Sequence, residues 1–301
     1  CRDSSEPQPG GKPEPALAWA GSLLAPLGSI RLGQPWPLGA STTARGVNFS
    51  LVAPTATRVE LLLFAQGNAP EPAQVVELDS SHRSGDLWHV EVEGVGIGCC
   101  YAYRVFGPLL PGRHGFNPSK LLLDPCARAI TGWDVYRRVD AVGAMPNTAS
   151  CLKGVVTERD RFDLRAAPRP RHSWQRTVIY ELHMGGFSRG PGSPVSEAAQ
   201  GTYLGLIEAI PYLNELGITT VELLPVMAFD PHDAPAGRLN YWGYSPISWM
   251  APHQAYQHGN DPLQIRQQVR ELVTACHHAG LEVLVDVVST TPVKATRPDP
   301  P

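Results

Sequence analysis

Apolar and polar positions divide the chain into two stretches with different periods. Between residues 34 and 130, short runs at 47–52, 88–93 and 101–105 alternate apolar with mostly polar residues, and 58–64 is a fourth run. Gly, Pro and Asp cluster between these runs, at spacings of roughly 10–15 residues, which is typical of an antiparallel β-sandwich. We therefore predict an immunoglobulin-like β-sandwich over 34–130.

From residue 177 onward, strands alternate with helices. The runs 177–182, 218–224 and 281–288 are short and apolar, and the third is broken only by Glu282 and Asp286. Near-continuous apolar strands joined by helices indicate a parallel α/β sheet.

Helical segments separate these strands. Pro211 divides the first helical region, and Gly217 ends it. Asp261 before Pro262 predicts the start of the helix that Gly280 stops. The apolar residues at helical spacing are Leu206, Ile207, Ile210, Leu213 and Leu216 in the first region, and Ile265, Val269, Leu272, Val273 and Cys276 in the second. Between the second strand and the second helix we expect a loop of more than ~30 residues.

The other segments lack a sustained period. Residues 1–33 contain several Pro and a Gly pair, and we expect a disordered leader there. Residues 131–176 end in a run of Pro and Arg and suit an inter-domain linker. The expected order is therefore leader, sandwich, linker, an α/β domain over 177–288 and a tail over 289–301.

Composition narrows the functional classes. A hydrophobic fraction of 43% over 301 residues can build real cores. A net charge of −3 gives no electrostatic case for nucleic acid or an anionic membrane. No apolar run approaches the roughly 18–20 residues of a membrane helix. The six cysteines and ten histidines show no metal-ligand spacing, so we expect neither metal nor cofactor, and free thiols in a reducing cytoplasm.

The expected long loop contains the run Asn240-Tyr241-Trp242-Gly243-Tyr244. Aromatic faces stack on the apolar C–H faces of sugar rings, and amide or hydroxyl neighbours bond the ring hydroxyls. The same rings could instead simply pack the loop onto the sheet. A position after a parallel strand favours binding, because sites in α/β proteins assemble at that edge.

Ionisable residues near the strand ends are further candidates. Asp286 lies in an apolar strand, where a buried carboxylate needs a partner; function and pairing with an arginine are both open. His183 follows the first strand and is the one histidine that we place near a site. Glu181 and Glu222 hold similar strand positions, yet they could equally cap loops or face the surface.

Several motifs, in order, resemble one family. The first of them, Trp36 to Gly39 with Gly46 to Ser50, is similar to the N-terminal carbohydrate-binding sandwich of glycogen debranching enzymes and isoamylases. The later motifs are Val178 to His183, Gly201 to Leu206, Leu216 to Val226, Asn240 to Tyr244 and Gly280 to Val288. The resemblance runs from about residue 34 to residue 288.

The resemblance implies a fold and an activity. Members of the α-amylase superfamily have a (β/α)8 catalytic barrel, and the debranching members hydrolyse α-1,6 branch points with retention. The implied partner is an α-glucan such as glycogen, amylopectin or limit dextrin, and the implied compartment is the cytoplasm, with a plastid as the alternative. By resemblance, Tyr244 stacks on the sugar, Asn240 and Trp242 shape the same wall, and Asp286 organises the subsite by hydrogen bonds. His183 is expected beside them.

The resemblance stops after Val288. The family continues with Asn-His, whereas residues 289–296 read Ser-Thr-Thr-Pro-Val-Lys-Ala-Thr. Deleting one base from a possible coding sequence for the family motif yields those residues, so a frameshift is one hypothesis. Retaining hydrolysis needs two carboxylates roughly 5 Å apart, and by resemblance both belong to later strands. We therefore expect an incomplete barrel that does not hydrolyse glucan. A non-catalytic glucan-binding module and an inactive regulatory partner are the alternatives.

Overall fold

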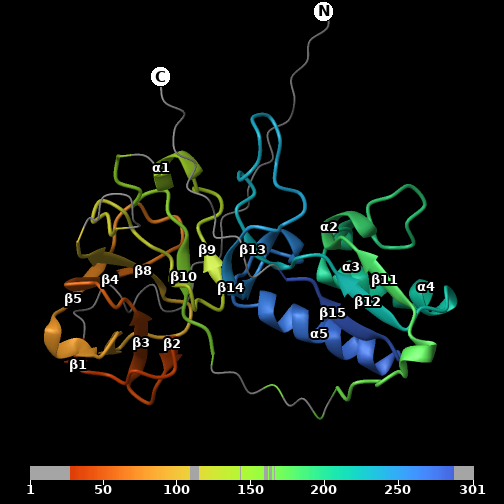
Figure 1. Cartoon of the computed structure of the whole chain (residues 1–301), viewed down its shortest axis with the longest axis horizontal. Helices are drawn as coiled ribbons and strands as arrows, with labels where there is room; N and C mark the ends of the chain where they lie inside the picture. Colours follow the sequence, from red (N-terminus) through yellow and green to blue (C-terminus); the bar gives the residue numbers. More distant parts are fainter. Residues whose placement is uncertain are drawn as a thin grey trace, which may run out of the picture.

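The computed structural model describes residues 28–108, 115–142, 144–158, 162, 165 and 167–287. The predicted tail over 289–301 and most of the predicted leader lie outside these residues. A β-sandwich and a parallel sheet with its helices lie side by side, with β13 and β14 between them (Figure 1). The predicted order of a sandwich followed by an α/β part is confirmed.

The sandwich consists of two antiparallel sheets. The first has the order β1-β7-β3-β2, with β6 paired to β7, and the second has the order β5-β4-β8-β10-β9. The strands of the first sheet are β1 (Ile30–Arg31), β2 (Gly39–Thr42), β3 (Gly46–Val52), β6 (Arg83–Ser84) and β7 (Leu87–Glu93). The strands of the second are β4 (Arg58–Phe64), β5 (Gln74–Leu78), β8 (Cys100–Phe106), β9 (Ile130–Thr131) and β10 (Lys153–Val155).

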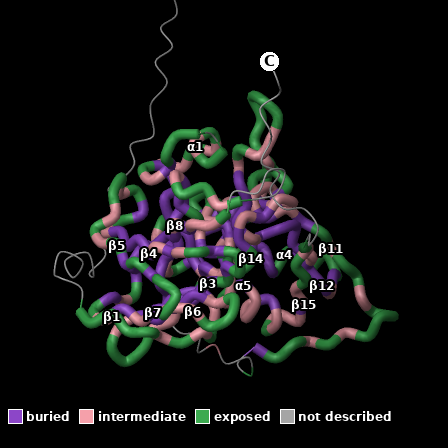
Figure 2. The backbone as a smooth tube through the Cα atoms, turned by 60° about the vertical axis from the view of Figure 1, so that its left-hand side comes forward, coloured by how far each residue is buried: buried purple, intermediate pink, exposed green. Residues whose placement is uncertain are grey.

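Alternation along these strands builds the sandwich core. Phe49, Trp88 and Tyr101 are almost fully buried in one apolar cluster between the sheets, and the rings of Phe49 and Tyr101 meet edge to face at 5.1 Å. Cys99 belongs to this cluster and Cys100 to another on the far side of the second sheet, as the period of a strand requires. Figure 2 shows the buried positions gathered inside the sandwich.

The sandwich is longer than the sequence pattern indicates. β1 lies inside the range expected to be leader, and β9 and β10 extend into the range expected to be linker. β1 pairs with β7, and β10 pairs with both β8 and β9. These strands have two or three residues, too few to show an alternation, and their pairing depends on neighbours distant in sequence.

The α/β part is built on a parallel sheet of order β11-β12-β15 within the described residues. Leu182 is in register with Leu223, and Leu223 with Val285. The strands are β11 (Ile179–Leu182), β12 (Thr220–Leu223) and β15 (Glu282–Val285), and the helices are α2 (Met184–Phe187), α3 (Tyr203–Glu208), α4 (Ile210–Glu215) and α5 (Ile265–His278). The short helix α1 (Arg138–Val142) lies on the sandwich side (Figure 1). The 3-10 turns of the α/β part are η4 (Trp174–Arg176), η5 (Glu197–Ala199) and η6 (Gln254–Tyr256), and η2 (Ser80–His82) belongs to the sandwich.

The helix predictions hold except for the burial of one residue and the start of one helix. Pro211 lies in the first turn of α4, and Gly217 follows α4 with a φ of +81°. Leu216, expected on the buried face, is the C-cap residue after α4 and is 51% exposed. The helix expected from Asp261 begins at Ile265 instead, because the Asp261 carboxylate accepts from the Leu263 N–H and closes a separate turn.

The expected long loop contains an antiparallel pair, β13 (Met227–Phe229) and β14 (Pro246–Pro252). Ala228 and Ala251 of this pair form one apolar cluster with Ala127, Ile130 and Leu152 of the sandwich. The segment after β12 therefore joins the two parts of the molecule.

Both outer strands of the parallel sheet have an open edge. Ile179 in β11 and Leu284 and Val285 in β15 are each more than two fifths exposed. These apolar positions are open because, among the described residues, no further strand pairs with β11 or β15 on its outer side. No helix in the described part of the chain is long and apolar enough to cross a bilayer.

Candidate functional site

The candidate residues meet at the carboxyl edge of the parallel sheet. His183 directly follows β11, and Asp286 directly follows β15. Because the three strands run parallel and in register, both side chains lie at the same edge, on either side of β12. The structure thus brings together residues that are about a hundred positions apart in the sequence.

The loop over residues 240–244 spans this edge from β11 to β15. On the β11 side, the His183 Nε2 lies 2.8 Å from the Tyr241 carbonyl oxygen, and the two rings stack with centroids 3.9 Å apart. On the β15 side, the Tyr244 hydroxyl donates a hydrogen bond of 2.5 Å to the Asp286 Oδ2. The loop is therefore fixed at both ends over the sheet.

Asp286 is partly exposed, and its partner is a tyrosine hydroxyl rather than the arginine considered from the sequence. The bond to Asp286, with the negative charges of Glu181 and Glu222 in addition, raises the pKa of Tyr244 to about 12. Tyr244 is therefore a hydrogen-bond donor to Asp286 over a wider pH range than an ordinary tyrosine. Glu181 and Glu222 are in register with each other and face the same side of the sheet.

The Asn240 side chain holds the turn of the loop by three hydrogen bonds. Its Oδ1 accepts from the Gly243 N–H at 3.1 Å, and its Nδ2 donates to the Ser245 Oγ at 2.9 Å and to the Asp230 carbonyl at 3.3 Å. Gly243 has a φ of +79°, and a Cβ there would lie 2.9 Å from the Phe229 ring. The loop is thus tightly held at its turn, and the Asn240 amide is engaged within the protein.

Two aromatic rings of the loop remain open to solvent. Trp242 is 57% exposed and Tyr241 is 51% exposed, and their rings meet edge to face at 5.5 Å. Tyr256, by contrast, is buried and packs in the core. The exposed indole and phenol faces, beside a carboxylate and a neutral hydroxyl, are the groups that a sugar ring requires for stacking and hydrogen bonding.

His183 is a neutral, positioning group in this arrangement. A carbonyl oxygen only accepts, so the His183 Nε2 carries the proton that binds Tyr241. Burial lowers the pKa of His183, which keeps the ring uncharged at neutral pH. Its Nδ1 is buried with no hydrogen-bond partner among the described residues. The ring therefore supports the Tyr241 end of the loop by stacking and by one hydrogen bond.

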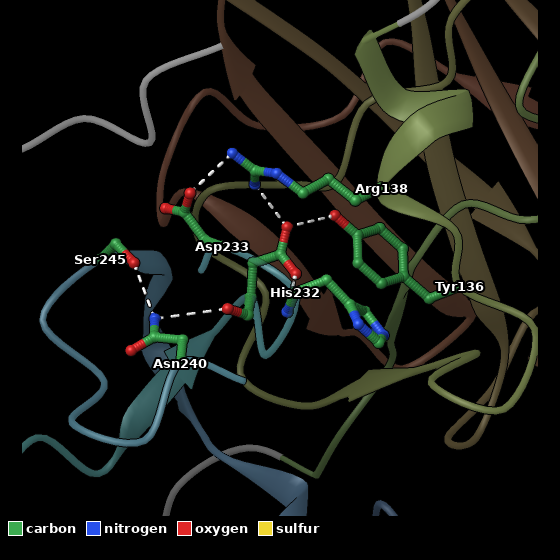
Figure 3. A network of polar contacts seen from close by, with 7 residues as sticks. Tyr136, Arg138, His232, Asp233, Asn240 and Ser245 are labelled. Carbon is green, nitrogen blue, oxygen red and sulfur yellow. Dashed lines mark hydrogen bonds and ion pairs between the residues drawn. The ribbon is translucent and has the colours of Figure 1, made fainter. Parts of the chain in front are cut away.

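A polar network ties this loop to the sandwich side of the molecule (Figure 3). The Asp230 carboxylate, whose side chain is 1% exposed, accepts from the Arg138 Nη1 at 2.6 Å and from the Tyr136 hydroxyl at 2.8 Å. Arg138 also donates to the Asp233 Oδ1 at 2.8 Å. Because the Asp230 carbonyl accepts from Asn240, the network reaches from the segment before α1 to the turn of the loop.

Sequence reasoning missed this network. Tyr136 and Arg138 fall in the segment interpreted as a linker, and they meet Asp230 across more than ninety residues. The only available signal was the acidic Asp230 following an apolar strand run. Within the described residues, no group of three or more His, Cys, Asp or Glu side chains is placed to hold a metal ion.

Comparisons with known proteins agree with this arrangement. Residues 37–127 match the model of carbohydrate-binding module 48, the isoamylase N-terminal domain. The glycogen debranching enzyme of Klebsiella pneumoniae strain 342 is 42% identical over 273 residues, covering 86% of this chain and 40% of the relative. The chain is related to the glycogen debranching enzymes and isoamylases. The glycogen debranching enzyme of Dickeya chrysanthemi is 37% identical over 272 residues, covering 87% of this chain and 40% of the relative.

The family resemblance of the sequence motifs is therefore confirmed. The chain spans about two fifths of the length of the curated relatives that it matches. Among solved structures, the catalytic module of the pneumococcal glycogen-degrading virulence factor SpuA superposes with a TM-score of 0.67 at 21% identity, covering 87% of this chain and 38% of that chain. The Group B Streptococcus pullulanase SAP, solved with maltotetraose, gives 0.67 at 22% identity, covering 86% and 34%. These two structures share the fold.

Proposed function

We propose that this chain is part of a debranching-type glycoside hydrolase and that its 240–244 loop, with Asp286, binds α-glucan near an α-1,6 branch. The observation that carries the proposal is the placement of the loop across the carboxyl edge of β11, β12 and β15. The loop presents the exposed Trp242 face beside the Tyr244–Asp286 pair. The relatives' name and the maltotetraose in the pullulanase structure support the choice of ligand.

In this proposal β11, β12 and β15 with α3, α4 and α5 are the first units of a (β/α)8 barrel. The open edges of β11 and β15 are where further strands would pair. Trp242 stacks on a glucose ring, while Tyr244 donates and Asp286 accepts hydrogen bonds. Asn240 and His183 position the loop, since the Asn240 Oδ1 and the His183 Nε2 each bond to its backbone.

The same geometry leads us to propose binding without cleavage by a polypeptide of these 301 residues. Retaining hydrolysis needs an acid and a nucleophile roughly 5 Å apart on either side of the bond. At the candidate site Asp286 is engaged by Tyr244, and by resemblance the acid and the nucleophile of the family belong to later strands of the barrel. The module 48 match favours a second candidate function, a glucan-binding module that docks on glycogen without any catalytic role. We also propose a reducing compartment such as the cytoplasm, because all five described cysteines are free thiols.

Binding of maltotetraose to Trp242→Ala tests the site. We expect calorimetry to show affinity at this site reduced about tenfold, as loss of an aromatic stacking face implies. Trp174→Ala is the matched control, because Trp174 is 85% exposed and lies away from the loop in η4. Equal effects of the two substitutions would contradict the proposal.

Reducing-sugar release from glycogen separates the enzyme from the binding module. We expect none from the 301-residue polypeptide. Release of linear maltooligosaccharides by this polypeptide would contradict binding without cleavage.

A further inference from the structure

The sandwich carries a cavity of its own, separate from the 240–244 loop. Its volume is about 750 Å³, within the roughly 300–1,000 Å³ range of small-molecule sites. Its charged lining residues are Arg31, Arg128 and Glu91, and Trp36 lines it beside them. These four residues come from separate segments of the chain, so the cavity is a property of the folded sandwich.

The two arginines bring positive charge to the cavity without an ion pair. Among the described residues, neither Arg31 nor Arg128 lies within ion-pair distance of a carboxylate. Arg31 is in register with Glu91 across β1 and β7, yet the Glu91 Oε1 accepts from the Thr43 Oγ1 at 2.7 Å. The Glu91 carboxylate is therefore oriented by a hydroxyl, and the Arg31 guanidinium keeps its donors for a ligand.

Asp124 is the carboxylate whose negative charge acts on Arg128. It is 1% exposed and does not line the cavity, and it accepts from the Tyr101 hydroxyl at 2.7 Å and from the Cys126 N–H at 2.8 Å. Asp124 is thus engaged inside the protein. Two guanidinium groups and one carboxylate line the cavity itself, which is therefore net positive.

This positive charge favours an anion, and the geometry of a guanidinium favours a phosphate. A guanidinium is planar and can donate two parallel hydrogen bonds to one phosphate group. Two of them match the charge of a phosphate monoester, which is about −1.5 to −2 at pH 7. A neutral ligand would leave both cationic groups without a charged partner.

Trp36 and Glu91 indicate that the ligand is larger than a phosphate ion. Trp36 is 64% exposed, and its indole offers an open face on which a planar base can stack. A single exposed apolar residue needs no explanation by itself, but this one stands in a cavity with two guanidinium groups. Glu91 would repel a phosphate placed beside it, whereas it can accept a hydrogen bond from a ribose hydroxyl, as acidic residues do in dinucleotide sites. Base, ribose and phosphate thus each have a matching group.

The segment that carries Trp36 is held firmly against the sheet. The Asn48 side chain is 4% exposed, and its Oδ1 accepts from the Gln34 N–H at 2.7 Å while its Nδ2 donates to the Gln34 carbonyl at 3.0 Å. Gly33 has a φ of +73°, and a Cβ there would lie 2.6 Å from the Asn48 Oδ1. This wall of the cavity is thus preorganised, which lowers the entropy cost of binding a ligand.

We propose that this cavity binds a nucleoside monophosphate, with the phosphate on Arg31 and Arg128, the base on Trp36 and the ribose on Glu91. Arg31, Trp36 and Arg128 all lie outside residues 37–127, which match the carbohydrate-binding module. The site does not rest on the proposed function, because no part of it touches the 240–244 loop. A ligand that binds only the folded sandwich also stabilises it, so the stability of this part depends on the nucleotide concentration.

Calorimetric titration of the full chain with adenosine monophosphate, in a buffer free of phosphate, tests the proposal. We expect one saturable site. Arg31→Gln and Arg128→Gln should each weaken binding about tenfold, as loss of a charge-assisted hydrogen bond implies, and Trp36→Leu should weaken it about as much. Arg45→Gln is the matched control, because Arg45 is exposed and does not line the cavity; its affinity should equal that of the wild type. Unchanged urea midpoints show that the arginine variants fold.

The choice of ligand is tested with fragments of the nucleotide. Adenosine and inorganic phosphate should each bind at least about tenfold more weakly than adenosine monophosphate, since each lacks one group of contacts. Inorganic phosphate or glucose 1-phosphate binding as tightly as adenosine monophosphate would overturn the assignment to a nucleotide.

Two results would overturn the site itself. One is the absence of saturable binding of adenosine monophosphate, and the other is equal affinity of Arg31→Gln and Arg45→Gln. Neither result changes the expected binding of maltotetraose at Trp242, so failure of this site and failure of the proposed function are distinguishable.

Discussion

Removal of Arg138 probes the junction between the sandwich and the loop most severely. Arg138→Ala leaves the Asp230 carboxylate, 1% exposed, without its cationic partner at 2.6 Å. Removing one partner of a buried ion pair costs roughly 3–5 kcal/mol, because the remaining charge is desolvated and uncompensated. Asp230 keeps the Tyr136 hydroxyl and the His232 N–H as donors, so we expect the free energy of unfolding to fall by about 3 kcal/mol, at the lower end of that range.

The measurement is the free energy of unfolding in urea at neutral pH, followed by tryptophan fluorescence. Arg137→Ala is the matched control, because the Arg137 side chain is 68% exposed and lies 3.6 Å from Asp140. An exposed pair of this kind contributes at most about 1 kcal/mol. Adding Asp230→Asn to Arg138→Ala should recover part of the loss, since the amide carries no charge. If Arg138→Ala were no more destabilising than Arg137→Ala, the buried-charge argument would be refuted.

Three further predictions concern the loop and its surroundings. Tyr244→Phe removes the bond to Asp286, so an ultraviolet titration of the variant should lose one tyrosine that ionises near pH 12. In the wild type, the stability that this bond contributes is present below about pH 10 and is lost as the pH rises through 12. Burial lowers the pKa of His253 to about 4 from its ordinary 6.5, so the melting temperature should fall between pH 6.5 and 4, and His253→Phe should flatten that fall. Gly243→Ala should lower the free energy of unfolding by about 1–3 kcal/mol and weaken maltotetraose binding. Gly237 has a similar φ of +77° but open space around a Cβ, so Gly237→Ala should lower the free energy of unfolding less and leave binding intact.

Local patterns predicted the elements whose cause is local. The seven-residue strands β3, β4, β7 and β8 alternate clearly, and Pro211 divides α3 from α4 as expected. The two-residue strands β1 and β9 could not be predicted, because their pairing is tertiary. The apolar sequence of β15 indicates a strand but not its burial, because burial depends on what covers a sheet.

The candidate site, too, could be predicted only in the parts that depend on local sequence. The aromatic run at 240–244 and the carboxylate of Asp286 are visible in the sequence, and parallel strands explain why they meet. Their contact through the Tyr244 hydroxyl is a property of the folded loop. The Arg138–Asp230 pair joins residues ninety-two positions apart, and the sequence around neither residue has a pattern that predicts this contact.

A crystal structure of the 301-residue chain with maltotetraose bound tests the central claim most directly. The account predicts a glucose ring stacked on Trp242, with hydroxyls within hydrogen-bond distance of Tyr244 and Asp286. Sugar bound elsewhere on the chain, with the ordered 240–244 loop open to solvent and carrying none, would contradict it.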